Sequence, residues 1–375
     1  DEEALRCGQA ECSGKECLPY QLLWGSLVRF LESGGLAPGE RAVLMSVGNG
    51  FRSCRANMFP LTQQIALERR GLGDRLAVAD LSLLTDSLVL TPVVWAGLVA
   101  NDLLLMVRFY NRATEARAGS CDELFAHWSD ELEHTLEQRD GRPGGAAAAV
   151  ARTLRRVERV VTAAAADFAA LPRRPDAAAV RDVFLCGDIY LRVDEWGNDG
   201  LQHRLAELGL RPVIEPYSGF FELLALREVQ ERSALSSLGA KRRLTLAAMR
   251  RIAARVIAAV QAAQPWVFWN DIREVEAESR RIFDGFPFGE TIPTVGGALL
   301  TTARDLVDGV VVVAPRGCGP ALISEAQLRR RADFPLLFVY NDGDPVDQAR
   351  LAGFAWRLRA RAPRVGASPA PGGQR

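Results

Sequence analysis

Residues 309–328 have the sequence GVVVVAPRGCGPALISEAQL, which carries the clearest signal for a fold. The first half is an unbroken run of small and β-branched apolar residues, which predicts a strand buried on both faces. A turn follows, and the composition of residues 320–331 predicts a helix. We then expect a strand in PLLFVYN, ending at Asn341, and a helix over 347–359. This order is typical of the parallel sheet of an α/β protein.

Two other regions show the same alternation. The apolar run RAVLMSV at 41–47 lies between glycines and predicts a buried strand, and VFLCGDIYL at 183–191 predicts a strand that continues into a loop. Around them we predict helices over Leu18–Leu31, Met58–Arg70, 199–208, 235–265 and 272–283, and a strand over 211–214. The fold class predicted from this order is α/β, in two units.

Changes in composition suggest the domain boundaries. We expect a first α/β domain over 1–118, a helical connector over 119–180 and a second α/β domain over 181–360. The remaining residues, 361–375, are rich in Pro, Gly and Ala, which predicts a disordered tail. The chain begins with Asp1 instead of Met, so we expect it to be part of a longer protein.

Charge and hydropathy limit the function classes. The formal net charge is zero, so no overall field attracts nucleic acid or an anionic membrane. None of the three histidines, His127, His134 and His203, is spaced like a pair of metal ligands. The most apolar stretch, 87–107, contains Asn101 and Asp102 and therefore favours a buried helix over a membrane span. We expect a soluble cytoplasmic protein without nucleic-acid or membrane partners.

The cysteines are the unusual feature of this sequence. There are seven, an odd number, and no basic and apolar signal segment opens the sequence, so disulfides are poorly supported. Cys54 and Cys318 follow predicted strands, and Cys17 precedes a predicted helix, where the helix dipole favours a thiolate. Positively charged residues lie close to these three cysteines in the sequence, namely Lys15, Arg52, Arg55 and Arg316. Gly317 and Gly319 flank Cys318 and allow the backbone to approach a ligand closely. Composition alone leaves two roles open for them, metal ligands or space-filling residues.

The other candidate residues have weaker signals. We expect Cys121 and Cys186 to fill space, and Cys7 and Cys12 to be either extra ligands or part of a flexible N-terminal segment. In the GDIYLR segment, Asp188, Tyr190 and Arg192 could face a cleft, or Arg192 could pair with Asp188 or Asp194. Glu16 could carry protons, although we favour a helix-capping role.

Six segments occur in the order seen in a known family: GKECLPYQLLWGSLVRFL, SCRANMF, RFYNRATEARAGSCDELF, CGDIYLRVDEWGNDGLQHRLAELGLRPV, GVVVVAPRGCGPALISEAQL and FPLLFVYNDGDP. Together they resemble the 2-hydroxyacyl-CoA dehydratase and activase-related family, and more closely its activase-related branch. Two motifs depart from the family pattern: Arg-Ser-Cys-Arg stands in place of Gly-Pro-Cys-Arg, and Pro-Arg-Gly-Cys in place of Pro-Phe-Gly-Cys. All three cysteines, Cys17, Cys54 and Cys318, are retained despite these changes.

The resemblance implies two Rossmann-like domains with parallel sheets and an iron–sulfur cluster in the cleft between them. It implies that Cys17, Cys54 and Cys318 hold this cluster, a 4Fe–4S or related larger one. The function implied is a redox protein, or a reductase or lyase like the dehydratases, working as a homo- or heterodimer. Its low-potential electrons would come from an ATP-dependent activase of the sugar-kinase and actin-like class. Two alternatives stay open: a non-catalytic scaffold or regulatory domain of a larger activase-like protein, and a zinc-binding cysteine site.

Overall fold

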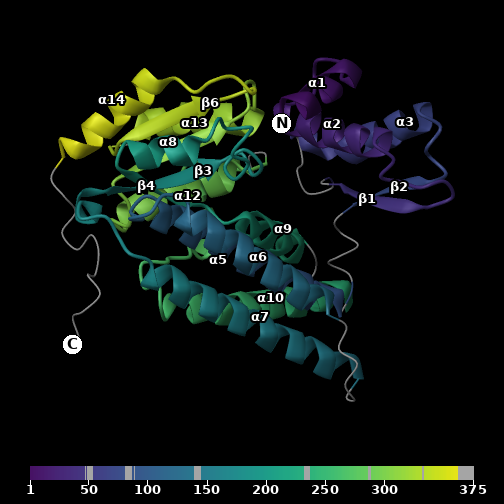
Figure 1. Ribbon diagram of the computed structural model, residues 1–375, viewed down its shortest axis with the longest axis horizontal. Helices are drawn as coiled ribbons and strands as arrows, with labels where there is room; N and C mark the ends of the chain where they lie inside the picture. Colours follow the sequence, from purple (N-terminus) through teal and green to yellow (C-terminus); the bar gives the residue numbers. More distant parts are fainter. Residues whose placement is uncertain are drawn as a thin grey trace.

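The fold is mixed α/β and 61% helical, with two small parallel sheets. The computed structural model describes residues 1–46, 48, 54–80, 87, 89–138, 145–231, 237–285, 289–331 and 333–361. Arg52 and all but the first residue of the predicted tail 361–375 lie outside the described residues. The arrangement of the elements is drawn in Figure 1.

The larger sheet has four parallel strands in the order β4-β3-β5-β6. Their bounds are β3 (Arg181–Gly187), β4 (Leu210–Ile214), β5 (Gly309–Ala314) and β6 (Leu336–Tyr340). Side chains alternate between two hydrophobic cores, because successive residues of a strand point to opposite faces. Val183 and Val311 belong to one core, and Phe184 and Val310 to the other. The uninterrupted apolar run of β5 is thereby explained: both of its faces are covered, as the sequence predicted.

Helices cover both faces of this sheet (Figure 1). One core is shared with α8 (Leu201–Glu207), α14 (Gln348–Arg359) and the start of α2 (Leu18–Glu32). The opposite core is shared with α5 (Leu90–Arg112), α12 (Thr291–Ala303) and α13 (Gly319–Arg331). Most of these helices were predicted, but α12 was not, because its TIPTVGGALL sequence is apolar on every side. Since α12 is buried on nearly all sides, it lacks the amphipathic pattern of a surface helix.

The smaller sheet pairs only β1 (Ala42–Ser46) with β2 (Leu76–Asp80), in parallel. The helical elements of this region are α1 (Glu2–Glu11), α2, η1 (Arg55–Met58) and α3 (Phe59–Arg69). The strand predicted at 41–47 is confirmed over its described residues, but the prediction that it is buried is wrong, because Val43 is 60% and Met45 40% exposed where only β2 pairs with it among the described residues. The five-residue strand β2 was missed. With two strands here and four in the larger sheet, the expectation of two Rossmann-like domains is not confirmed.

Helix α1 packs tightly along α2, although the sequence left open a flexible N-terminal segment. A Cβ atom placed on Gly8 would lie 1.9 Å from the carbonyl oxygen of Gln21, and one on Gly25 would lie 1.7 Å from that of Ala4. Two helices come this close only where the facing residues lack side chains. Glycine at both positions therefore brings α1, and the cysteines it carries, against α2.

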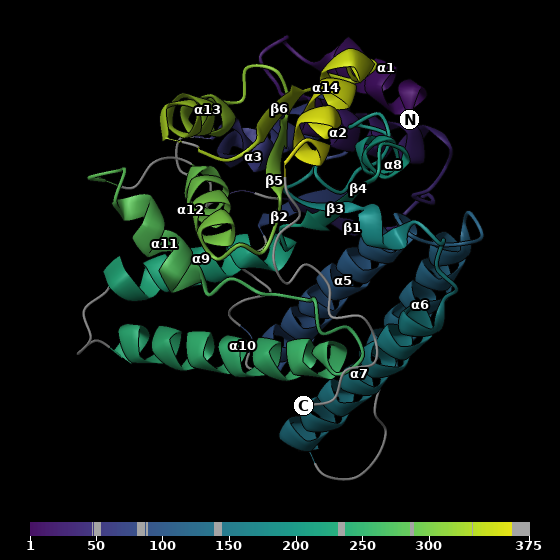
Figure 2. The same ribbon diagram turned by 90° about the vertical axis from the view of Figure 1, so that its left-hand side faces the viewer.

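A layer of long helices lies beside the larger sheet (Figures 1 and 2). It consists of α5, α6 (Ser120–Glu137), α7 (Gly145–Ala170) and α10 (Ser237–Gln261). The described residues also form the helices α9 (Tyr217–Glu231) and α11 (Ile272–Arg280) and a short 3-10 helix, η2 (Ala177–Ala179). The predicted connector 119–180 contains α6 and α7, which pack against α5, and α7 also packs against α10; residues 171–176 of the connector are not helical.

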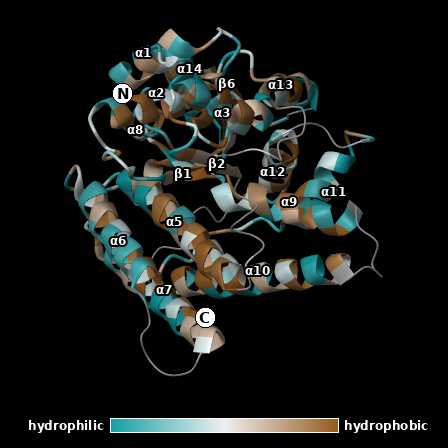
Figure 3. Cartoon of the chain, turned by 90° about the vertical axis from the view of Figure 1, so that its right-hand side faces the viewer, coloured by the Kyte–Doolittle hydropathy of each residue, from teal (hydrophilic) through white to brown (hydrophobic). Residues whose placement is uncertain are grey.

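Helix α5 is the apolar centre of this layer (Figure 3). Among the described residues it is the one helix long and apolar enough to cross a membrane, and 61% of its most apolar window is buried inside the protein. Burial of this kind is typical of a core helix and is compatible with a soluble protein.

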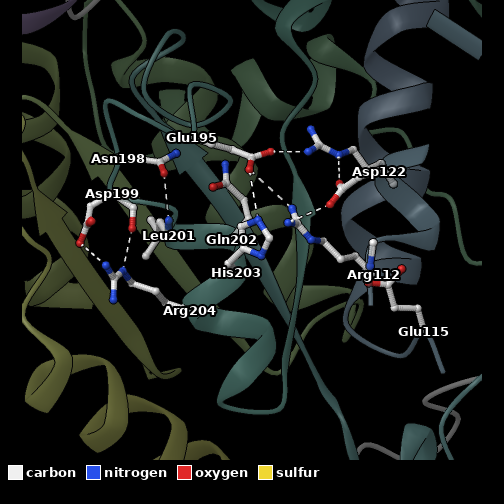
Figure 4. A network of polar contacts seen from close by, with 12 residues as sticks. Arg112, Glu115, Asp122, Glu195, Asn198, Asp199, Leu201, Gln202, His203 and Arg204 are labelled. Atoms are coloured by element: carbon white, nitrogen blue, oxygen red, sulfur yellow. Dashed lines mark hydrogen bonds and ion pairs between the residues drawn. The ribbon is translucent and has the colours of Figure 1, made fainter. Parts of the chain in front are cut away.

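Charged residues tie the helical layer to the sheet (Figure 4). Arg108 on α5 lies 2.7 Å from Asp122 on α6 and 2.7 Å from Glu195, which follows β3. Arg112 lies 3.0 Å from Asp122, and His203 on α8 lies 3.3 Å from Glu195. Two arginines and two carboxylates thus balance one another where α5, α6 and α8 meet.

The buried Asp102 on α5 caps the N-terminus of α9. Its two carboxylate oxygens accept backbone hydrogen bonds from Tyr217 at 2.9 Å and from Ser218 at 2.7 Å.

Replacement by alanine leaves both donors unsatisfied, so we expect Asp102→Ala to lower the free energy of unfolding by about 1–3 kcal/mol. Urea denaturation measures this change. Asp130→Ala, at an exposed position of α6, is the control and should change stability by no more than about 0.5 kcal/mol; equal effects of the two substitutions would contradict the capping role.

The same carboxyl predicts a pH effect. Burial raises the pKa of Asp102 to about 6, against the hydrogen bonds from Ser218 and Tyr217. In the unfolded chain this carboxyl has the ordinary pKa of about 3.9, so the folded state binds the proton more tightly. The stabilisation that the protonated Asp102 contributes to the folded state is therefore lost as the pH rises from about 4 to about 6. In thermal unfolding across this range, Asp102→Asn should therefore gain Tm relative to the wild type, with a constant difference above pH 7. A difference that does not vary with pH would show that Asp102 does not titrate in this range.

Candidate functional site

The strand order of the larger sheet reverses between β3 and β5, which creates a switch point at their carboxyl ends. In open parallel sheets ligands bind at such points. The backbone N–H of Asp188, directly after β3, donates to the carbonyl oxygen of Val313 on β5 at 2.8 Å. Gly187 has a φ of 111°, and a Cβ atom there would lie 2.3 Å from the same oxygen. Glycine is therefore required for the chain to turn this closely over the edge of the sheet.

The three cysteines singled out by the sequence occupy equivalent positions at three helix starts. Cys17 is the N-cap residue of α2 and Cys54 that of η1, and Cys318 directly precedes α13. A backbone N–H of the first helical turn lies near each sulfur and favours its thiolate form, from Tyr20, Ala56 and Ala321 respectively. Three helix N-termini, which carry partial positive charge, thus each present a thiol.

Contacts bring these cysteine segments together although they are far apart in sequence. The guanidinium of Arg55 donates to the carbonyl oxygen of Lys15 at 2.8 Å and to that of Gly317 at 3.2 Å, which joins the loops before Cys17 and Cys318. Near them, a Cβ atom on Gly289 would lie 3.6 Å from Cβ of Cys54 and 2.8 Å from Cγ of Pro320. Cys17, Cys54 and Cys318 therefore surround one region beside the switch point.

The electrostatic surroundings differ from the sequence prediction. Burial raises the pKa of Cys17 to about 11 and that of Cys54 to about 12, and it raises the pKa of Cys318 further. Nearby carboxyls act in the same direction and outweigh the helix N-termini. Of the predicted cations, Arg55 lies at the site, whereas Arg316 pairs with Asp344 and Lys15 contributes its carbonyl oxygen. The free thiols are thus protonated at neutral pH.

Two of these carboxyls form an acidic pair that the sequence reveals only in part. Asp188 was a candidate, but Glu290, the N-cap residue of α12, was not. Burial and, to a smaller extent, the neighbouring Asp188 raise the pKa of Glu290 to about 8. Both groups also raise the pKa of Cys54 and Cys318. Because α12 was not predicted, no sequence signal placed Glu290 at a helix start facing the cysteines.

Arg192 forms its ion pair with a residue other than Asp188 or Asp194, the two that the sequence suggested. Its side chain is 1% exposed and donates to Glu215 at 2.7 Å, to the carbonyl oxygen of Gly187 at 3.1 Å and to that of Pro216 at 3.0 Å. The expected pairing of Arg192 with Asp188 or Asp194 is therefore wrong, since β4 ends beside β3 and brings Glu215 closer. Tyr190 hydrogen-bonds to Asp194 instead.

Glu16 organises the loop before α2. Its carboxylate accepts backbone hydrogen bonds from Ser13 at 2.9 Å and from Lys15 at 3.0 Å. It therefore caps the turn that leads to Cys17. The sequence had suggested a cap on the first turn of the helix instead.

The remaining cysteines fall into two groups. Cys121 and Cys186 are completely buried in the hydrophobic core that contains α5. Cys12 follows the last residue of α1, and together with Cys7 it packs at the edge of the apolar cluster that also contacts Cys17 and Cys54. Burial raises the pKa of Cys12 to about 12, and Cys17 contributes to this shift.

The cysteines as placed do not form a site for a single metal ion. Among the residues that the structure describes, no three His, Cys, Asp or Glu side chains are close enough to hold one metal ion. A zinc ion needs its sulfur ligands about 2.3 Å away, which brings the ligands into contact with one another. An iron–sulfur cluster has iron and sulfide atoms of its own between the thiolates, and backbone N–H groups stabilise its sulfurs. Cys17, Cys54 and Cys318 at three helix starts are compatible with such a cluster.

Comparisons with known proteins give no relatives. No family model matches the chain, and no curated protein and no solved structure shows significant similarity to it.

We expect Arg55 to hold the cysteine segments in place. Arg55→Met removes both hydrogen bonds that join the loops of Cys17 and Cys318, so these thiols should react with iodoacetamide several-fold faster in the native protein. Mass spectrometry of the labelled peptides measures the rate at each cysteine. Cys121 and Cys186 are internal controls and should keep their slow rates. Unchanged rates at Cys17 and Cys318 would show that the two hydrogen bonds do not restrain the site.

Proposed function

We propose that this protein is an iron–sulfur redox protein whose cluster is held by Cys17, Cys54 and Cys318. One observation carries the proposal: three thiols, each at the start of a helix, surround a region beside the switch point of a parallel sheet. Three ligands would leave one iron without a protein thiolate. The order of sequence motifs that resembles the 2-hydroxyacyl-CoA dehydratase and activase-related family supports the same proposal.

Residues of the chain have distinct tasks in this proposal. The cluster, when bound, would supply one-electron transfer at a potential set by its ligands and surroundings. The first-turn N–H groups near the three sulfurs would orient the thiolates and reduce their negative charge. Arg55 would add the opposite charge and link the loops. The acidic pair Asp188 and Glu290 lies beside the thiols, where it can hold a proton.

The electron source belongs to the proposal too. The resemblance suggests an ATP-dependent activase of the sugar-kinase and actin-like class as the donor, and a dimer as the working form. A 2-hydroxyacyl-CoA ester as substrate would follow from the dehydratase branch of that family. Turnover with an activase and ATP would distinguish an enzyme from a scaffold that only retained the cluster.

Metal analysis tests the proposal directly. After anaerobic purification we expect about four iron and four sulfide per chain and the broad visible absorption of thiolate-bound iron. Cys17→Ser, Cys54→Ser and Cys318→Ser should each abolish that absorption, because each removes a ligand. Cys121→Ala and Cys186→Ala, which change buried cysteines outside the site, should retain it.

Other outcomes would replace the proposal. A colourless protein that contains zinc, lost in the same three serine variants, would establish the zinc-binding alternative. A protein that takes up neither metal after anaerobic reconstitution would favour the scaffold alternative. Retention of the iron absorption in any one of the three serine variants would remove that cysteine from the ligand set.

A further inference from the structure

Helix α7 carries a dense cluster of arginines on the side of the molecule formed by the helical layer. Arg152, Arg155, Arg156 and Arg159 lie within eight residues, at spacings of three and four that place them on neighbouring turns of the helix. Together with Glu158 and Thr162 of α7 and Ala259 of α10 they line a groove of about 600 Å³. This volume falls in the range of small-molecule sites, roughly 300–1,000 Å³.

The positive charge of this groove is not neutralised from within. Glu158 is the one carboxylate that lines it, and it is engaged by Arg255 of α10 at 2.8 Å. Arg155 and Arg159 are exposed and form no ion pair with any residue in the described part of the chain. Like charges at helical spacings of three and four repel one another and destabilise a helix. A bound anion would remove this repulsion.

Helix α10 crosses α7 beside the groove and supplies Ala259 to its lining (Figure 2). Glu158 contacts Arg255, and just beyond the end of α10 Gln264 donates to the carbonyl oxygen of Ala165 at 3.0 Å. Arg251 lies one helical turn before Arg255, so it adds a cation on the same stretch of α10. Arg255, through its ion pair with Glu158, thus places a cation of α10 beside the arginines of α7.

We propose that this groove binds a polyphosphate chain, such as inorganic polyphosphate or the triphosphate of a nucleotide. The planar guanidinium matches the oxygens of a phosphate and can contact two of them at once. Successive turns are about 5.4 Å apart, so several arginines can reach one chain of linked phosphates. The lining offers no aromatic side chain and, besides Ala259, no apolar residue, so recognition rests on charge and not on a ring or a hydrophobic side chain. This site is separate from the cysteine site and does not depend on its function.

Isothermal titration calorimetry of the full chain tests the proposal, with sodium tripolyphosphate and magnesium-free ATP as the two probes. We expect saturable binding that weakens as salt rises, because exposed charges are screened over about 10 Å or less at 0.1 M and above. Arg155→Gln/Arg159→Gln should raise the Kd at least about tenfold, since it removes two unpaired guanidiniums. The matched control, Arg330→Gln/Arg357→Gln, removes the same charge from exposed positions of α13 and α14 and should leave the Kd unchanged.

The two probes distinguish the sources of the phosphate chain. Equal affinity for both probes would show that the groove recognises the phosphate chain alone. Tighter binding of ATP would show that it recognises a nucleotide. Lack of saturable binding of either probe would overturn the proposal, as would an equal loss of affinity in the control variant. Tighter binding of a poly-glutamate peptide than of tripolyphosphate, with the same dependence on Arg155 and Arg159, would overturn it in favour of an acidic protein partner.

Discussion

The parallel pairing of β3 with β5 is the contact on which the rest of the structure depends. It joins segments that are more than a hundred residues apart and places β4 on one side and β6 on the other. Both strands bury side chains on their two faces, so the helices on each side have a fixed surface to cover. The reversal of strand order at this pair also creates the edge where Asp188 and the Cys318 loop lie.

The cysteine site combines opposing electrostatic effects. Helix N-termini favour thiolates, whereas burial and the acidic pair Asp188 and Glu290 favour neutral thiols, and burial dominates. A site of this kind keeps its cysteines protonated until a metal binds, so ligand binding must displace protons. The tertiary structure therefore lowers the reactivity of the thiols, and Arg55 holds the loops before Cys17 and Cys318 together.

Charge is distributed unevenly in a chain with no net charge. Where α5, α6 and α8 meet, arginines and carboxylates neutralise one another at distances close to 3 Å. On α7 the arginines outnumber the carboxylates, and two of them have no ion-pair partner among the described residues. Because formal net charge averages over both regions, it conceals the basic groove, and the expectation that no field attracts anions holds only for the chain as a whole.

The sequence by itself determined the local elements whose patterns depend on neighbouring residues. The apolar run of β5, the helix that follows Cys318 and the strand at 41–47 were all predictable, because residue alternation and turn-forming glycines act over a few residues. The placement of three cysteines beside strands or helix starts was predictable in the same way. Only the tertiary structure decided that β2 completes a two-stranded sheet, that Glu215 pairs with Arg192 and that Glu290 faces the cysteines. These contacts join residues that are distant in sequence, and burial sets their energies, so no local pattern of residue types could reveal them.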